Sequence, residues 1–118
     1  MAASRVTIYH NPRCRTSRTV LEMLREKGID PEIVLYLETP PSAAELKKLI
    51  EAAGIRPIDL VRRKEPLAKE LGIGTREYTD RELIQLMADN PILIERPLVV
   101  KGKRAVLARP PERLQELL

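Results

Sequence analysis

The sequence predicts an α/β fold, in which a mixed sheet of about four strands carries an inserted block of helices. Three observations predict it: a strand–helix–strand pattern over residues 5–37, a helical stretch without strands over about 42–90, and a hairpin pattern over 98–108. A chain of 118 residues has the length of one ordinary domain. We therefore expect a single domain over residues 1–118, with the helical block as an insertion.

The N-terminal part is typical of a βαβ unit. Arg5–Tyr9 is β-branched and aromatic, which predicts a strand, and the loop residues His10–Pro12 follow it. From Arg15 to Lys27 apolar residues recur with a helical period, up to Gly28. Glu32–Leu37 then predicts a second strand. A strand, helix and strand of these lengths predict that the two strands are parallel.

Two capping boxes mark the helices of the inserted block. The Ser-x-x-Glu pattern at 42–45 opens a helix that ends at Gly54, and the Thr-x-x-Glu pattern at 79–82 opens another that Asn90-Pro91 closes. Two shorter helices are expected between them, at Pro57–Lys64 and Pro66–Leu71.

The C-terminal part predicts a hairpin and a last helix. Leu98–Val100, a turn at 101–103 and Arg104–Ala108 form the hairpin pattern, and Pro111 begins a short helix. Together with the βαβ unit, this order predicts a thioredoxin-like fold with helices inserted in its middle. Because the chain has no Phe and no Trp, its core is expected to consist of Leu, Ile, Val, Ala and Met.

Composition excludes several kinds of site. A single Cys excludes an internal disulfide, and one Cys with one His argues against a metal site, so we expect no metal and no bound cofactor. No apolar run approaches the ~20 residues of a membrane span, and no secretory signal opens the chain, which favours a cytoplasmic protein without a membrane partner. The net charge of +4 is spread along the chain with few aromatics, so nucleic acid is not expected. Isolated arginines suit small anions better.

Cys14 is the candidate nucleophile. It stands between the first strand and the first helix, so its sulfur is expected near a helix N-terminus, which favours an anion. Arg13, Arg15 and Arg18 add positive charge, which predicts a lowered thiol pKa and a reactive thiolate. The alternative, a small buried hydrophobic residue, is the usual role of a free Cys, but three nearby arginines disfavour it.

Ser17 occupies the second position of a Cys-x-x-Ser pattern, where thioredoxins carry Cys. Without an internal resolving thiol, Cys14 can form a disulfide only with another molecule. This favours a cycle in which a small thiol such as glutathione forms a mixed disulfide and an outside thiol releases it. The Ser17 hydroxyl is expected to donate a hydrogen bond to the thiolate, to cap the helix, or both.

Four sequence strings, in order along the chain, support a family resemblance. They are His-Asn-Pro-Arg-Cys-Arg-Thr-Ser-Arg at 10–18, Tyr-Leu-Glu-Thr-Pro-Pro at 36–41, Arg-Pro-Leu-Val-Val at 96–100 and Arg-Pro-Pro-Glu at 109–112. They resemble the glutaredoxin-coupled arsenate reductases of the ArsC type, which share the thioredoxin-like superfamily and are related to Spx-type proteins. The resemblance implies that Cys14 attacks arsenate or a related oxyanion. Glutathione as co-substrate and glutaredoxin as partner would then resolve the adduct.

The resemblance also implies an arginine clamp for the anion. Its members here are Arg62, Arg96 and Arg109, with Arg63 replacing Arg62 if the register slips by one. Planar guanidinium donors suit a tetrahedral oxyanion and stay charged at every working pH. The thioredoxin-like fold further implies a cis peptide bond before Pro97.

The remaining site candidates surround Cys14. The family uses a histidine near the thiolate, here His10, and we count it with Cys14 and Ser17 as catalytic; a simple loop histidine is the alternative. Asn11 and Arg18 are counted with the substrate-binding residues, although Asn11 is also suited to shaping the turn.

Arg15 departs from the family pattern, because the arsenate reductases carry Gly after the cysteine. Its long side chain could crowd the anion or add another positive group. Two alternative functions stay open: a glutathione-dependent thiol reductase of another substrate, and an Spx-like regulator that binds RNA polymerase. Such regulators often carry a Cys-x-x-Cys switch, which Ser17 removes here.

Overall fold

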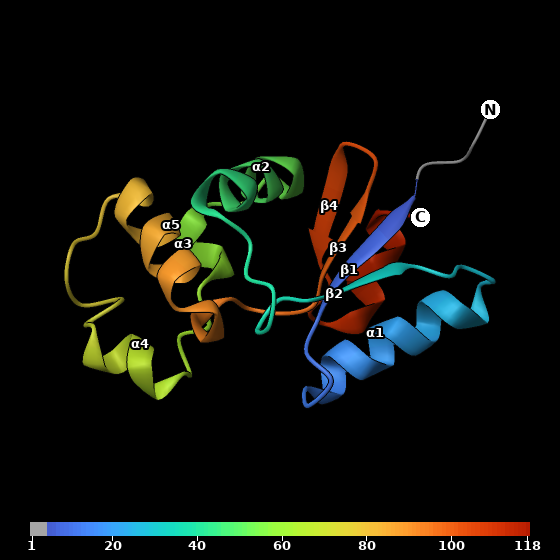
Figure 1. Ribbon diagram of the computed structural model, residues 1–118, viewed down its shortest axis with the longest axis horizontal. Coiled ribbons are helices and arrows are strands. Elements are labelled where there is room, and N and C mark those ends of the chain that lie inside the picture. The colour runs from blue at the N-terminus through green and yellow to red at the C-terminus, as the bar shows by residue number, and fades with distance from the viewer. Residues whose placement is uncertain (1–4) are drawn as a thin grey trace. The chain divides into compact units, whose positions relative to one another are not determined.

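The computed structural model describes residues 5–118. The chain forms two compact units, one made of the segments up to Thr39 and from Arg96 onwards, the other of Pro40–Glu95. Among the described residues, all four strands of the sheet belong to the first unit (Figure 1). The first four residues of the domain predicted over 1–118 lie outside the described part.

The first unit is built on a four-stranded mixed sheet, as predicted, in the order β2-β1-β3-β4. Its strands are β1 (Val6–His10), β2 (Glu32–Leu35), β3 (Leu98–Lys101) and β4 (Arg104–Leu107). The predicted parallel pairing of β1 and β2 is confirmed, whereas β3 runs antiparallel to both β1 and β4. Strand β1 lies between β2 and β3, so the turn that follows β1 lies beside the end of β2 and the start of β3.

The second strand is shorter than predicted. It ends at Leu35 rather than Leu37, because the Leu35 carbonyl accepts hydrogen bonds from the backbone N–H groups of Glu38 and Thr39, both at 2.9 Å. These bonds fold the chain into a turn and take Tyr36 out of the strand.

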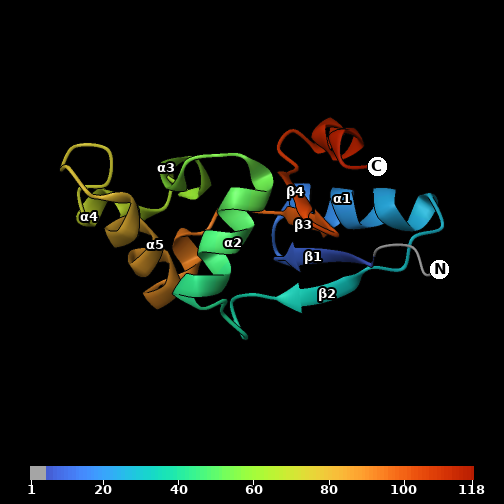
Figure 2. The ribbon, with the colours of Figure 1, turned by 90° about the horizontal axis from the view of Figure 1, so that it is seen from above.

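Two helices cover one face of this sheet (Figure 2). The predicted first helix is α1 (Arg15–Glu26), and Gly28 follows it with a φ of 77°. The C-terminal helix, η2 (Pro111–Glu116), is a 3₁₀ helix, a tighter coil than sequence periodicity could distinguish. Together with the inward residues of the strands they form one core: Val6, Ile8, Val20, Leu21, Leu24, Val99, Val106, Ala108, Leu114 and Leu117.

The second unit is helical and contains α2 (Ala43–Ala53), α3 (Pro57–Leu60), α4 (Pro66–Glu70), α5 (Asp80–Asp89) and η1 (Pro91–Leu93). Both predicted capping boxes are confirmed: the hydroxyl oxygens of Ser42 and Thr79 each accept a backbone N–H at 3.1 Å. The predicted end at Gly54 is also confirmed, with a left-handed φ of 65°.

Helix α3 is half as long as predicted. The sequence predicts a helix over Pro57–Lys64, but the backbone becomes extended at Val61, which forms an isolated antiparallel bridge with Ile94. The N–H of Arg62 donates to the Leu93 carbonyl and the N–H of Glu95 to the Leu60 carbonyl, both at 2.7 Å. Pairing with a distant segment therefore replaces the last turn of the predicted helix.

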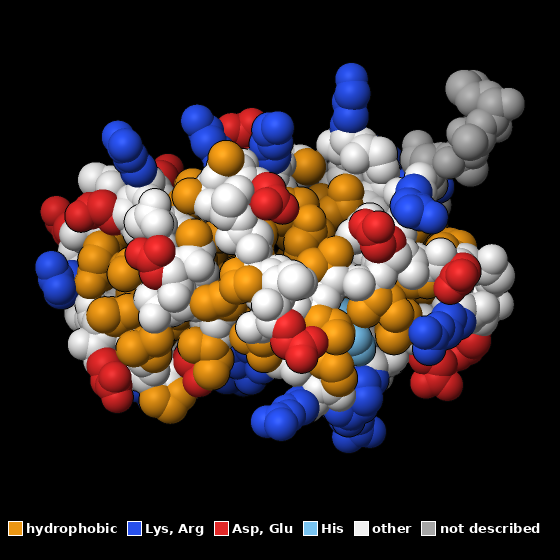
Figure 3. All heavy atoms as spheres, in the orientation of Figure 1, with side chains coloured by type: hydrophobic (Ala, Val, Ile, Leu, Met, Phe, Trp, Pro, Cys, Tyr) orange, Lys and Arg blue, Asp and Glu red, His pale blue; other side chains and the backbone are white. Residues whose placement is uncertain are grey.

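The buried hydrophobic residues are Leu, Ile, Val, Ala and Met, as predicted, with Tyr36 as an exception. Within the part of the chain that the structure describes, no helix is long and apolar enough to cross a membrane. Charged side chains of both signs are interspersed on the face drawn in Figure 3, which agrees with the spread of charge along the sequence.

Candidate active site

The turn between β1 and α1 places Cys14 at the N-terminus of a twelve-residue helix, as predicted. Cys14 is the N-cap, with extended backbone angles, and its N–H donates to the Asn11 carbonyl at 3.0 Å. Its own carbonyl accepts the N–H of Arg18 at 3.0 Å, the first hydrogen bond of the helix. The sulfur thus lies where backbone N–H groups and the helix dipole favour a negative charge.

Cys14 is half-buried, and its thiol is more acidic than an ordinary cysteine. Burial raises the pKa of the Cys14 thiol. The backbone N–H of Ser17 and the guanidinium groups of Arg96 and Arg109 lower it by more than burial raises it, so the pKa lies below its usual value. The lowered pKa that the sequence predicts is therefore confirmed. The expectation rested on Arg13, Arg15 and Arg18, and all three are exposed. The arginines that bond the sulfur are Arg96 and Arg109, from the far end of the chain.

The β3–β4 hairpin explains why Arg96 and Arg109 meet. Leu98 pairs with Leu107 at the open end of the hairpin, so the residues just before β3 and just after β4 lie together. Nη1 of Arg109 is 3.7 Å from the Cys14 sulfur and donates to the Arg96 carbonyl at 3.0 Å. Atoms Nε and Nη1 of Arg96 are buried.

Both arginines precede a cis proline. The Arg96-Pro97 bond is cis, as the family resemblance implied, and the Arg109-Pro110 bond, which the sequence did not single out, is cis as well.

His10 and Ser17 bond to each other behind the cysteine. Nδ1 of His10 lies 2.6 Å from Ser17 Oγ, which also accepts the N–H of Asn11 at 3.1 Å. Both side chains are buried. The Ser17 hydroxyl is therefore engaged by the end of β1 and makes no cap on α1, whereas the Ser17 backbone N–H bonds the sulfur. Sequence reasoning assigned that bond to the hydroxyl.

The imidazole of His10 favours its neutral form. Burial lowers its pKa below the ordinary value, and the positive charges of Arg25 and Arg18 lower it further. A neutral ring with its proton on Nε2 lets Nδ1 accept the Ser17 hydroxyl proton, while Ser17 Oγ accepts from Asn11.

Asn11 and Arg18 hold the turn itself. The side-chain oxygen of Asn11 accepts the Arg13 N–H at 2.9 Å, which bears out its suitability for shaping the turn. The Arg18 side chain is exposed, and its Nη1 donates to the Pro12 carbonyl at 2.9 Å. Binding of substrate by either residue stays a prediction.

Arg62 belongs to the unit Pro40–Glu95, where two carboxylates face it. Its Nη1 donates to Glu95 Oε1 at 2.9 Å, and its Nε lies 3.8 Å from Glu65 Oε2. Arg63 is exposed. No sequence pattern indicated a role for Glu95, and the anion-binding role of Arg62 stays a prediction.

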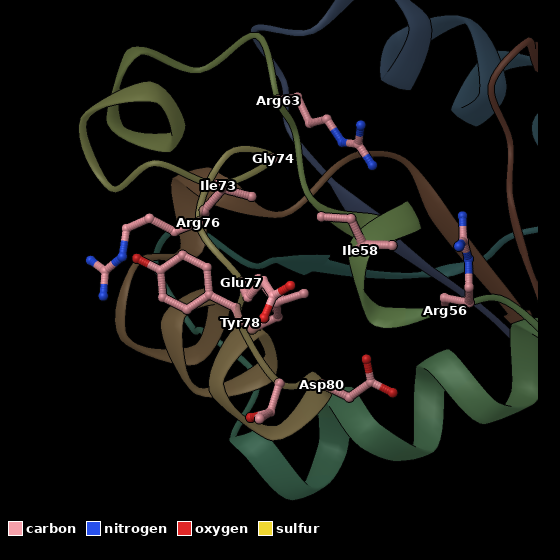
Figure 4. Close-up of a pocket in the computed structure, with 11 residues that line it drawn as sticks. Arg56, Ile58, Arg63, Ile73, Gly74, Arg76, Glu77, Tyr78 and Asp80 are labelled. Carbon is pink, nitrogen blue, oxygen red and sulfur yellow. The ribbon is translucent and has the colours of Figure 1, made fainter.

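A cavity of about 700 Å³ lies within Pro40–Glu95 (Figure 4). Three arginines line it, but the guanidinium of Arg56 is hydrogen-bonded to Asp59, and that of Arg76 lies 5.0 Å from the centre of the Tyr78 ring. Its positive groups are therefore partly compensated, and no cysteine lines it.

Two smaller cavities adjoin the turn that carries Cys14. They measure about 350 and 430 Å³, and His10 and Pro12 line both. No group of three or more His, Cys, Asp or Glu side chains able to hold a metal ion occurs within residues 5–118. Cys14, Arg96 and Arg109 together are suited to nucleophilic attack by a thiolate that lies beside two guanidinium groups.

Comparison with known proteins identifies the family. The ArsC family model matches residues 9–117. The uncharacterised protein YfgD of Escherichia coli strain K12 is 48% identical over 114 residues, which are 96% of each chain. An arsenate reductase of Escherichia coli is 49% identical over 115 residues, 98% of this chain and 82% of that protein.

A solved structure shows the same fold. The arsenate reductase from Vibrio cholerae matches with a TM-score of 0.94 at 45% identity, and the match covers 99% of this chain and 100% of that one. The predicted thioredoxin-like fold with an inserted helical block is thereby confirmed. Because the family model spans residues 9–117 and an arsenate reductase is 49% identical over 98% of this chain, the chain belongs to the ArsC family.

Proposed function

We propose that this protein reduces arsenate to arsenite, with the Cys14 thiolate as nucleophile. The observation that carries the proposal is the position of the Cys14 sulfur, at a helix N-terminus and 3.7 Å from the Arg109 guanidinium. Similarity to arsenate reductases over nearly the whole chain supports arsenate as the oxyanion.

The reaction needs the charge of arsenate to be neutralised before a thiolate can approach it. Arg96 and Arg109 supply positive charge beside the sulfur, and the proposal adds Arg62 on the strength of the motif resemblance. Positioned guanidinium groups also stabilise charge that moves onto oxygen as an As–O bond breaks. Asn11 and Arg18 are retained as substrate-binding candidates through the loop that they hold.

The proposed cycle has three thiol steps. The Cys14 sulfur forms a bond to As(V), and an oxygen leaves as water after protonation. A glutathione thiolate then attacks the Cys14 sulfur, and the S–As electron pair passes to arsenic, which leaves as arsenite, As(III). A thiolate of glutaredoxin then attacks the glutathione sulfur of the mixed disulfide. The Cys14 thiolate is released, and a glutaredoxin–glutathione disulfide forms, which further glutathione reduces.

The reductant has to come from outside the chain, because Cys14 is the single cysteine of the sequence. Glutathione as co-substrate and glutaredoxin as partner follow from this need and from the family resemblance. A cycle that consumes reduced thiols suits the cytoplasm, where we place the protein. His10 and Ser17 take part as the pair that fixes the turn around the thiolate.

The test measures arsenite production from arsenate with glutathione, glutaredoxin, NADPH and glutathione reductase. We expect turnover that stops when either thiol component is omitted. No turnover, with a glutaredoxin that is active on a control disulfide, would contradict arsenate reduction. A Cys14–glutathione disulfide that glutaredoxin reduces without any stimulation by arsenate would instead favour a thiol reductase of another substrate. Capture of the RNA polymerase α subunit by the pure protein would favour the regulator.

A further inference from the structure

We infer that Glu95 is a positioning residue that holds the Arg62 guanidinium ready for the oxyanion. This inference rests on the proposed function, in which Arg62 binds arsenate. The family resemblance gives Glu95 no role; the assignment comes from its contact with Arg62.

The backbone brings the two residues together. Val61 and Ile94 form an isolated antiparallel bridge, and hydrogen bonds of 2.7 Å on either side join the N–H of Arg62 to Leu93 and the N–H of Glu95 to Leu60. Both bridging residues are buried. The bridge therefore fixes the Cα positions of Arg62 and Glu95 independently of their side chains.

The side chains then make a direct ion pair. Nη1 of Arg62 donates to Glu95 Oε1 at 2.9 Å, and the exposed fractions of the two side chains are only 22% and 18%. Partial burial weakens screening by water, so this pair is stronger than one on the open surface. Glu65, 3.8 Å from Nε, adds a second and longer contact.

The contact with Glu95 orders the Arg62 side chain, which would otherwise be free to rotate. The guanidinium sits on a long chain with several rotatable bonds, and binding an anion would require it to be ordered. The Glu95 carboxylate orders it before the anion arrives, by accepting a hydrogen bond from one end of the planar fork. Glu95 also directly precedes Arg96 in the sequence. Two consecutive residues therefore carry the carboxylate that holds Arg62 and a guanidinium that bonds the Cys14 sulfur.

The experiment is a double-mutant cycle on arsenate reduction with Arg62→Ala, Glu95→Ala and the double variant, extended by Glu95→Gln. We expect Glu95→Ala to raise the KM for arsenate about tenfold with kcat changed less than about twofold, as loss of a charge-assisted contact does. Glu95→Gln keeps an oxygen acceptor and should restore KM to within about twofold of the parent. In the Arg62→Ala background, Glu95→Ala should add nothing.

Thermal unfolding of each variant accompanies the kinetics, and Glu116→Ala serves as the control. Glu116 pairs with Arg113 at 3.0 Å, and the two side chains are exposed by 56% and 40%, so its loss should leave KM unchanged. If Arg62→Ala raises KM but Glu95→Ala does not, or if the two effects multiply independently, the inference about Glu95 is wrong while the proposed function stands. If Arg62→Ala leaves KM unchanged, the role proposed for Arg62 fails, and the inference fails with it.

Discussion

The Nη1 atom of Arg109 lies 3.7 Å from the sulfur of Cys14, although 95 positions separate the two residues in the chain. The contact forms because β1, which leads into the cysteine turn, is the neighbour of β3 in the sheet, and β3 pairs with β4. A cysteine on one turn thus receives its counter-charge from the open end of a hairpin.

Replacing Arg109 should make Cys14 a weaker acid. The guanidinium stabilises the thiolate, so Arg109→Ala removes one of the groups that lower the Cys14 pKa, and the pKa moves upward. The rate of alkylation by iodoacetamide, measured against pH, gives the midpoint. Arg15→Ala is the matched control, since Arg15 adjoins Cys14 but is exposed, whereas Arg96 and Arg109 are the arginines that lower the Cys14 pKa. An equal shift in both variants would contradict the structural assignment.

Cys14→Ser should abolish arsenate reduction. An alcohol is far less nucleophilic than a thiolate at neutral pH, and helix and arginines do not ionise it. We expect arsenite formation at the background rate of the assay without protein. Because Cys14 is half-buried and serine has nearly the same shape, circular dichroism should show the parent fold. Substantial residual turnover would end the assignment of Cys14 as nucleophile.

Arg96→Lys should cost more than a change that keeps the charge would suggest. The Arg96 guanidinium bonds the Cys14 sulfur from a partly buried position, and an ammonium cannot reproduce its planar set of donors. We expect kcat/KM for arsenate to fall about tenfold or more, equivalent to about 1.4 kcal/mol. Arg5→Lys, at an exposed ion pair with Glu32, is the control and should match the parent. Parent-like kinetics for Arg96→Lys would remove Arg96 from the anion site.

The His10 imidazole should make the folded state less stable in mild acid. Its pKa is lowered in the folded protein, by burial first and then by Arg25 and Arg18, so the unfolded chain binds a proton more readily. The contribution is fully present above the ordinary pKa of 6.5 and is lost as pH falls from there through the folded pKa.

Denaturant unfolding at a series of pH values measures this effect. The parent should lose stability on acidification more steeply than His10→Gln, because the variant lacks the group that titrates. The chain has no other histidine, which makes the difference between the two curves specific to His10. Parallel curves would show that the imidazole is not held neutral.

Local interactions account for most of what could be predicted. The capping boxes at Ser42 and Thr79, the helix stop at Gly54 and the position of Cys14 at the start of α1 each depend on groups within a few residues of one another. Hydrogen bonds and side-chain periods of this kind are visible in the order of the amino acids. The βαβ unit followed from the same periods together with the length of its crossover.

Long-range pairing decided the features that could not be predicted. Helix α3 stops at Leu60 because the next residue, Val61, pairs with Ile94. The neighbouring contact between Arg62 and Glu95 likewise joins residues that are 33 positions apart in the chain. Residues 57–64 by themselves show a helical period, and nothing in them predicts that Val61 pairs with Ile94. The ion pair between Arg62 and Glu95 depends on the same bridge and was equally invisible.

The surroundings of Cys14 show which features the sequence predicts and which ones only the folded structure determines. The order of amino acids was enough to predict a cysteine with a lowered pKa and its place at a helix start, and the structure confirms both. The sequence also indicated the three nearest arginines, Arg13, Arg15 and Arg18, as the source of positive charge. All three are exposed, and Arg96 and Arg109 bond the sulfur instead. Side chains on a turn spread outward, whereas the register of β3 with β4 places two distant guanidiniums on the same sulfur; only the folded sheet specifies that register.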